Sequence, residues 1–63
     1  MHDVLELLAS QLEERRKSLI ESLGDGGPKT FDEYKYVTGV VRGLLMAQSS
    51  IADLAKHMEN SDE

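Results

Sequence analysis

Few side chains in this sequence could do chemistry. The chain has two histidines and no cysteine, so metal ligation would have to use His2, Asp53 and His57. Asp53 and His57 are four residues apart and would share a helical face, and His2 would have to reach the same end. Isolated surface histidines are far commoner than zinc ligands. We therefore predict no metal site and no other cofactor.

The sequence also lacks a pattern that is typical of an active site. Two histidines, scattered serines and no cysteine do not supply a nucleophile with a neighbouring base and an orienting group. The glycine-rich run 24–27 has no Gly-Lys-Ser/Thr ending of a phosphate-binding loop. We expect a protein that acts by binding and is not an enzyme.

One basic cluster could bind an anion. Arg15, Arg16 and Lys17 follow each other directly, and we take Arg15 and Arg16 as the candidate phosphate or RNA contacts. Glu13 and Glu14 lie within one helical turn and offer ion pairs instead. The chain has 12 acidic and 7 basic residues, a net charge of −5. That charge disfavours nucleic acid and anionic membranes as partners.

The spacing of apolar residues predicts two helices, at 4–23 and 31–59. Apolar residues recur at intervals of three, four and seven in both segments. Gly24 is expected to end the first helix, and Thr30 with Glu33 forms a capping-box pair at the start of the second. A short loop between long helices favours antiparallel neighbours. The fold class is therefore all-α, an antiparallel two-helix hairpin with a heptad seam, in one domain of residues 1–63.

A hairpin of this size needs more apolar contact than it can make alone. Ordering a chain costs about 1.5 kcal/mol per residue, and two helices bury only one side each. Without cysteine there is no disulfide to help. We predict a homo-oligomer, with a dimer and its four-helix bundle favoured. The most apolar stretch, 37–47, contains Arg42 and is too short to span a bilayer, so we expect no membrane association.

The unequal helix lengths predict where a partner binds. If Leu23 lies near Phe31, the last turns of the second helix extend past the start of the first and leave apolar side chains uncovered. A second apolar row beside the seam widens the face near the loop, although the first helix could cover most of it. Tyr36 should be the more exposed of the two tyrosines. The predicted interface residues are Tyr34, Tyr36, Val41, Leu45, Leu54 and Met58.

Gly39, Gly43 and Ala47 form a stripe of small residues at a spacing of four. Each glycine costs about 1 kcal/mol of helix stability relative to alanine. We favour close packing against another backbone or a large side chain as the reason. On an antiparallel register Arg15 and Arg16 lie opposite the stripe, so a guanidinium stem could occupy it. A kink in the helix is the alternative.

Two segments carry a resemblance to a known group of proteins. Leu12–Lys17 contains Glu-Glu-Arg-Arg, and Phe31–Leu44 contains Phe-x-Glu-Tyr-Lys and Gly-x-x-Arg-Gly-Leu. This pattern resembles small helical-hairpin proteins encoded by tailed bacteriophages, notably short-tailed ones. The resemblance covers about residues 5–58 and implies a phage origin near virion morphogenesis. It implies no catalytic residue.

These observations favour a non-enzymatic phage protein that acts through protein–protein contacts, as a virion component or in virion assembly. Its partners would be copies of itself and another phage or host protein. It would lie in the cytoplasm of the infected cell or in the virion. The alternative is a small regulator that binds a host protein or structured RNA. Size, charge and hairpin layout resemble the plasmid repressor-of-primer protein, an architectural analogy only.

Overall fold

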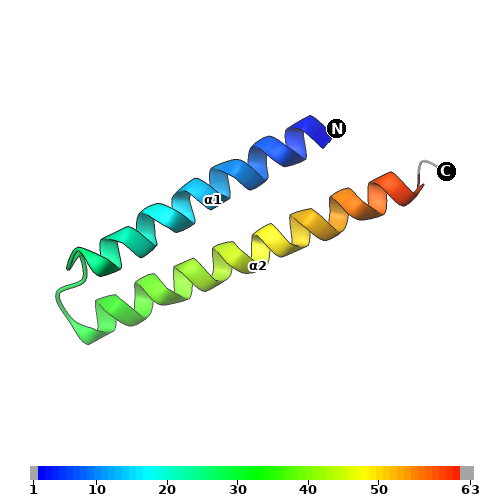
Figure 1. Ribbon diagram of the computed structural model, residues 1–63. Helices are drawn as coiled ribbons and strands as arrows, with labels where there is room; N and C mark the ends of the chain where they lie inside the picture. Colours follow the sequence, from blue (N-terminus) through cyan, green and yellow to red (C-terminus); the bar gives the residue numbers. More distant parts are fainter. Residues whose placement is uncertain (1, 62–63) are drawn as a thin grey trace.

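The protein folds as two antiparallel α-helices, which confirms the predicted all-α hairpin (Figure 1). The structure is a computed structural model that describes the backbone of residues 2–61 and the side chains of residues 3–60. Helix α1 spans His2–Gly24 and helix α2 spans Phe31–Ser61. They form one flat layer with Cα extents of 51 × 16 × 12 Å. Neither described helix is long and apolar enough to cross a membrane.

The two helices pack along one line of contact, which we call the seam. Its residues recur every three or four positions on each helix, because that spacing returns a side chain to the same face. All of them are only half-buried. The apolar seam residues are Leu5, Ala9, Leu12, Leu19 and Leu23 on α1, and Val37, Val40, Val41, Leu44, Ala47, Ile51, Ala55 and Met58 on α2.

Helix α1 ends in a left-handed turn at Gly26. Gly26 has φ of 81°, and the Gly27 N–H donates to the Ser22 carbonyl oxygen at 2.8 Å. This is the Schellman pattern, in which glycine takes the left-handed position after the last turn. The prediction that Gly24 is the left-handed residue that ends the helix is therefore wrong. Gly24 is the last helical residue, and the left-handed position falls two residues later.

Helix α2 begins with the predicted capping box. The Glu33 N–H donates to Thr30 Oγ1 at 3.1 Å, and the Lys29 N–H donates to Glu33 Oε1 at 2.7 Å. Two otherwise unpaired backbone donors are satisfied in this way. The helix then runs without interruption through Gly39 and Gly43. The alternative prediction, a kink at these glycines, is therefore not supported by any break in the helix.

The alignment of the helices differs from the predicted one. Ser22 lies beside Tyr36 and Val37 at the loop end, so Leu23 does not lie level with Phe31. The first turns of α2 extend past the end of α1, and α2 extends past α1 at both ends (Figure 1). Residues 25–30 allow this offset, because a connection of that length can span the distance between the end of α1 and the start of α2. A tight turn could not.

This alignment corrects one predicted feature of the interface. Leu5 and Glu6 near the start of α1 line a hollow together with Ala55 and Glu59 of α2. The first turns of α1 therefore lie alongside the segment that contains Leu54 and Met58. The prediction that these two residues project beyond α1 is wrong, although Leu54 is still 48% exposed.

Two glycines of the same turn should respond to alanine in opposite directions. Gly24→Ala places a methyl group where no atom lies within 4 Å, and it should raise the free energy of unfolding by up to about 1 kcal/mol. Gly26→Ala forces alanine into the left-handed region and should lower it by about 1–2 kcal/mol. Urea denaturation followed by circular dichroism, at one fixed chain concentration, measures both. Equal effects of the two substitutions would contradict the assignment of the turn.

Candidate interaction surface

No side chain among residues 3–60 is fully buried. The chain exposes 5072 Å², whereas a compact monomer of its 7.0 kDa mass exposes about 4,000 Å². The excess is about 1,000 Å² and reflects the flat, one-layer shape. The surface of this protein is therefore where its function has to be sought.

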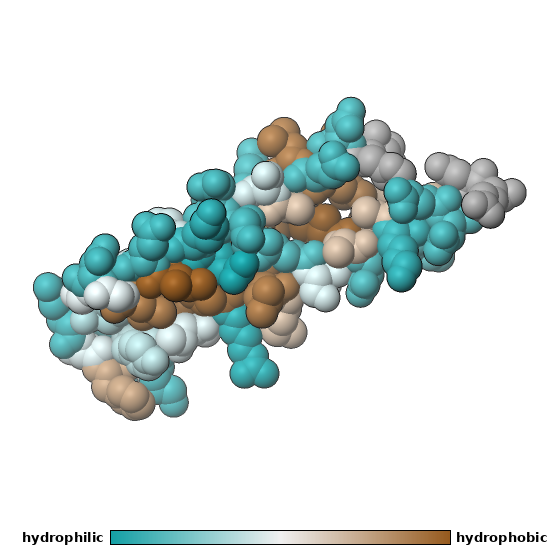
Figure 2. Space-filling model, viewed as in Figure 1, coloured by the Kyte–Doolittle hydropathy of each residue, from teal (hydrophilic) through white to brown (hydrophobic). Residues whose placement is uncertain are grey.

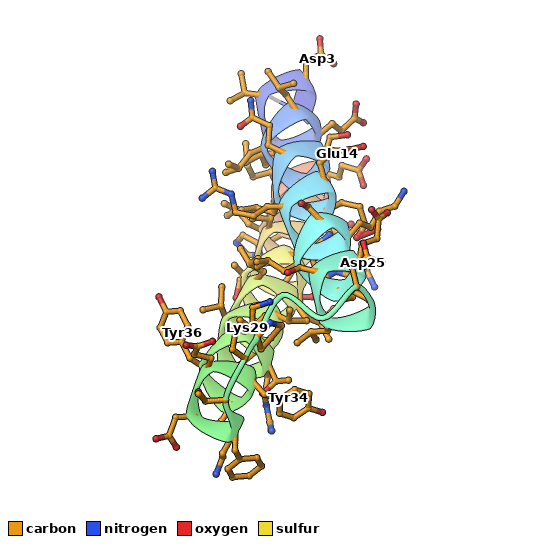
Figure 3. The ribbon with its side chains drawn as sticks, turned by 90° about the vertical axis from the view of Figure 1, so that its left-hand side faces the viewer. Asp3, Glu14, Asp25, Lys29, Tyr34 and Tyr36 are labelled. Carbon is orange, nitrogen blue, oxygen red and sulfur yellow. The ribbon has the colours of Figure 1, made fainter. Side chains whose placement is uncertain are left out.

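The seam divides the remaining surface into two broad faces. Successive helical residues are rotated by about 100°, so residues three, four or seven apart share a side. Tyr34 and Tyr36 point to opposite sides of the hairpin (Figure 3). The six predicted interface residues are therefore split between the two faces: one carries Tyr34, Val41 and Leu45, and the other carries Tyr36, Leu54 and Met58.

The face that carries Tyr34 has charges of both signs, and we call it the mixed face. Figure 2 shows it, with hydrophilic side chains interrupting the apolar surface in the middle of the hairpin. Ile20 and Leu45 are 44% and 52% exposed on its loop half. The mixed face consists of Glu6, Ser10, Glu13, Lys17 and Ile20 on α1, and Tyr34, Thr38, Val41, Leu45, Ser49, Ala52, Lys56 and Glu59 on α2.

The face that carries Tyr36 has Arg15 toward its middle and acidic side chains at its loop end, where Asp32 and Glu33 line a hollow, and we call it the low-charge face. Val4, Leu8 and Leu54 are 66%, 41% and 48% exposed near the end of the hairpin opposite the loop, which we call the free end. Apolar and small uncharged polar residues make up the rest. The low-charge face consists of Val4, Leu8, Gln11, Arg15, Ser18 and Ser22 on α1, and Asp32, Glu33, Tyr36, Val40, Gly43, Ala47, Ser50, Leu54 and Met58 on α2.

Each face has one open hollow at the seam. The hollow on the low-charge face lies at the loop end and is lined by Ser22, Gly27, Pro28, Asp32, Glu33, Tyr36 and Val37. The hollow on the mixed face lies near the free end and is lined by Leu5, Glu6, Ala9, Gln48, Ile51, Ala52, Ala55 and Glu59. Both linings are mostly apolar and open to solvent, which suits a side chain of another helix better than a small polar ligand.

A polar cluster crosses the seam in the middle of the hairpin. Arg16 pairs with Glu13, and its Nε donates to Gln48 Oε1 at 2.9 Å. Gln48 Nε2 in turn donates to Glu13 Oε1 at 3.4 Å. Hydrogen bonds from Arg16 and then Gln48 hold the pKa of the Glu13 carboxyl below its usual value. Gln48 was not among the predicted site residues, and its signal in the sequence is a polar residue next to the apolar seam of α2.

Of the two arginines that were predicted to contact an anion, one belongs to this polar cluster and the other does not. The Arg16 guanidinium is engaged within the hairpin by Glu13 and Gln48. Arg15 is exposed on the low-charge face and forms no hydrogen bond or ion pair with the part of the chain that the structure describes. The structure therefore does not bring Arg15 and Arg16 together as one anion-binding pair.

The two glycines of the small-residue stripe do not pack within the hairpin, whereas Ala47 belongs to the seam. A methyl group added at Gly39 or Gly43 would meet no atom within 4 Å, so the prediction that an arginine stem occupies this stripe is wrong. Only Ala47 is half-buried. The reason is the position of the two glycines on the side of α2 that faces away from α1. Close approach of another chain stays a prediction.

The candidate metal ligands are not brought together among the described residues. No group of three histidine, aspartate or glutamate side chains within residues 3–60 could hold a metal ion. The His2 side chain lies outside the described ones, so the set with Asp53 and His57 is not defined by the structure.

Comparisons with protein-family models, with curated proteins and with solved structures find no match to this chain. The geometry of the hairpin and its two faces therefore carries the functional argument.

The Glu13 cluster should make the hairpin sensitive to acid. Because the hydrogen bonds from Arg16 and Gln48 hold the pKa of the Glu13 carboxyl in the folded chain below its usual value of 4.5, the charged carboxylate stabilises the fold above that pH. The stabilisation is lost as pH falls through the folded pKa. Glu13→Gln should therefore flatten the dependence of unfolding free energy on pH below about 4.5. Glu14→Gln, which removes an exposed neighbouring carboxylate, is the control, and an equal flattening in both variants would contradict the cluster's role.

Proposed function

We propose that this chain is a protein-binding module that works by self-association, with two hairpins completing one helical bundle. The observation that supports it best is the lack of any fully buried side chain within residues 3–60, together with about 1,000 Å² of excess surface. A standard protein–protein interface covers about 800 Å² on each partner. Association with a second hairpin therefore removes the excess.

The exposed apolar residues support this proposal over a purely monomeric role. Ten large hydrophobic side chains within residues 3–60 are exposed, and seven of them lie on the two broad faces of the thin hairpin. Soluble monomers rarely expose contiguous apolar patches of more than a few hundred Å². A binding function accounts for apolar residues that the fold itself leaves in water.

We further propose that the module acts in a bacteriophage, as a virion component or in virion assembly. The support is the resemblance of Leu12–Lys17 and Phe31–Leu44 to small phage proteins, together with a surface suited to other helices. Purified particles from infected cells should contain the chain. Its absence from particles, with recovery on a host protein or structured RNA, would support the regulator instead. RNA has less support, since Arg16 is held by Glu13 and Gln48.

Solution mass and helicity should fall together on dilution. Multi-angle light scattering over a wide concentration range should show a dimer or larger assembly at high concentration. Circular dichroism at the same concentrations should show loss of helix as the assembly dissociates, because the hairpin alone has no buried core. A chain that stays monomeric and unfolds cooperatively at all concentrations would contradict self-association.

A further inference from the structure

We propose that the low-charge face binds a second copy of this chain, with the two hairpins face to face and their loops at opposite ends. The inference rests on the proposed self-association and names the surface and orientation that it uses. Four features of the hairpin support it: the placement of charge, the size of the face, the small residues at its middle and the shape of its two ends.

Charge favours this face for a second copy of the same chain. The protein carries a net charge of −5, so two copies repel each other wherever their acidic residues meet. The acidic side chains of the low-charge face, Asp32 and Glu33, lie at its loop end beside the hollow, so the two copies keep them apart when their loops are at opposite ends. The mixed face presents Glu13 at its middle, where two copies would meet, as well as Glu6 and Glu59. Like charges across an interface cost several kcal/mol. A contact between two identical faces therefore has the lower electrostatic repulsion on the low-charge face.

The size of the face matches what a stable dimer needs. Cα extents of 51 and 16 Å give a broad face with a projected area of about 800 Å², comparable with the accessible area that each partner contributes to a standard interface. Val4, Leu8 and Leu54 supply exposed apolar surface on it. A partner of the same length and width covers this face from end to end.

The small residues lie where two copies would meet most closely. Gly43, Ala47 and Ser50 surround the middle of α2 (Phe31–Ser61) on this face. Same-face contact in a dimer has a two-fold axis in the plane of the interface. If that axis crosses the middle of the hairpin, α2 lies against the partner's α2 at these small residues. A methyl group added at Gly43 would have no neighbour within 4 Å in the single hairpin. The backbone of a second copy therefore has space to approach at this position.

The two ends of the face fit each other in the same orientation. The free end carries the exposed side chains of Val4, Leu8 and Leu54. The loop end carries the open hollow that Pro28, Tyr36 and other residues line. With the loops at opposite ends, the apolar free end of each copy lies over the hollow of the other. With the loops at the same end, hollow would face hollow.

Two leucines of similar exposure allow a matched test of the face. Leu54 is 48% exposed on the low-charge face and Leu45 is 52% exposed on the mixed face, so glutamate costs the single hairpin a similar amount at either position. Leu54→Glu should weaken dimerisation at least about tenfold, because the dimer would bury two carboxylates. Leu45→Glu should change it by less than about twofold. Light scattering gives the dissociation constants, and circular dichroism confirms that both variants are helical.

The outcomes separate this inference from the proposed function. If Leu45→Glu disrupts the dimer and Leu54→Glu does not, or if neither does, self-association stands and the low-charge face is not the interface. Equal disruption by both variants also overturns the choice of face. A wild-type chain that is monomeric throughout overturns the proposed function, and this inference with it. Capture of a different protein by a monomeric hairpin belongs to that last outcome.

Cross-linking tests the orientation in the wild-type background, which has no cysteine. Ala47→Cys places a thiol near the expected two-fold axis, and a short bis-maleimide should link two copies through it. Ser49→Cys, two residues away on the mixed face, should give no dimer band. If Ala47→Cys fails to link in a chain that light scattering shows to be dimeric, the loops are not at opposite ends. Cross-linking at Ser49→Cys alone would place the interface on the mixed face.

Discussion

The seam between α1 and α2 is the one apolar contact on which the fold depends, and a pair of helices can meet along only one such line. Each helix leaves its other sides in water, so none of the side chains of residues 3–60 is fully buried. Hydrophobic stabilisation is roughly proportional to apolar area removed from water. The remaining area can only be removed by contact with another molecule, which is the physical basis of the proposed association.

The polar cluster at the middle of the seam supplies alignment more than stability. A part-buried ion pair gains little net free energy, since desolvation offsets attraction. Arg16 reaches Glu13 and Gln48 together only when α1 and α2 are aligned as observed. The apolar seam residues alone repeat every heptad and would tolerate a shift by one repeat. A single hydrogen-bonded group between the helices removes that ambiguity.

The sequence predicted the helices well and their relative position poorly. Apolar spacing and the Thr30–Glu33 pair are local signals, and both helices and the capping box were confirmed. The alignment depends on the path of a short glycine-containing connection, and any of Gly24, Gly26 or Gly27 could have taken the left-handed conformation. The spacing of residues along a helix does not by itself identify the side that packs against the neighbouring helix. For that reason the glycines at 39 and 43 were placed against α1 when they face away from it.

Helical spacing also explains why the predicted interface divided into two. Tyr34 and Tyr36 are two residues apart, which on a helix turns one side chain about 200° from the other (Figure 3). A list of exposed apolar residues therefore mixes two surfaces with different electrostatics. The low-charge face suits a contact with an identical acidic chain, because its acidic side chains, Asp32 and Glu33, lie at the loop end and stay apart when the loops of the two copies are at opposite ends. The mixed face keeps Glu6, Lys17, Lys56 and Glu59 exposed, so a partner on that face would have to match charges of both signs. One thin hairpin can thus serve two contacts without their overlapping.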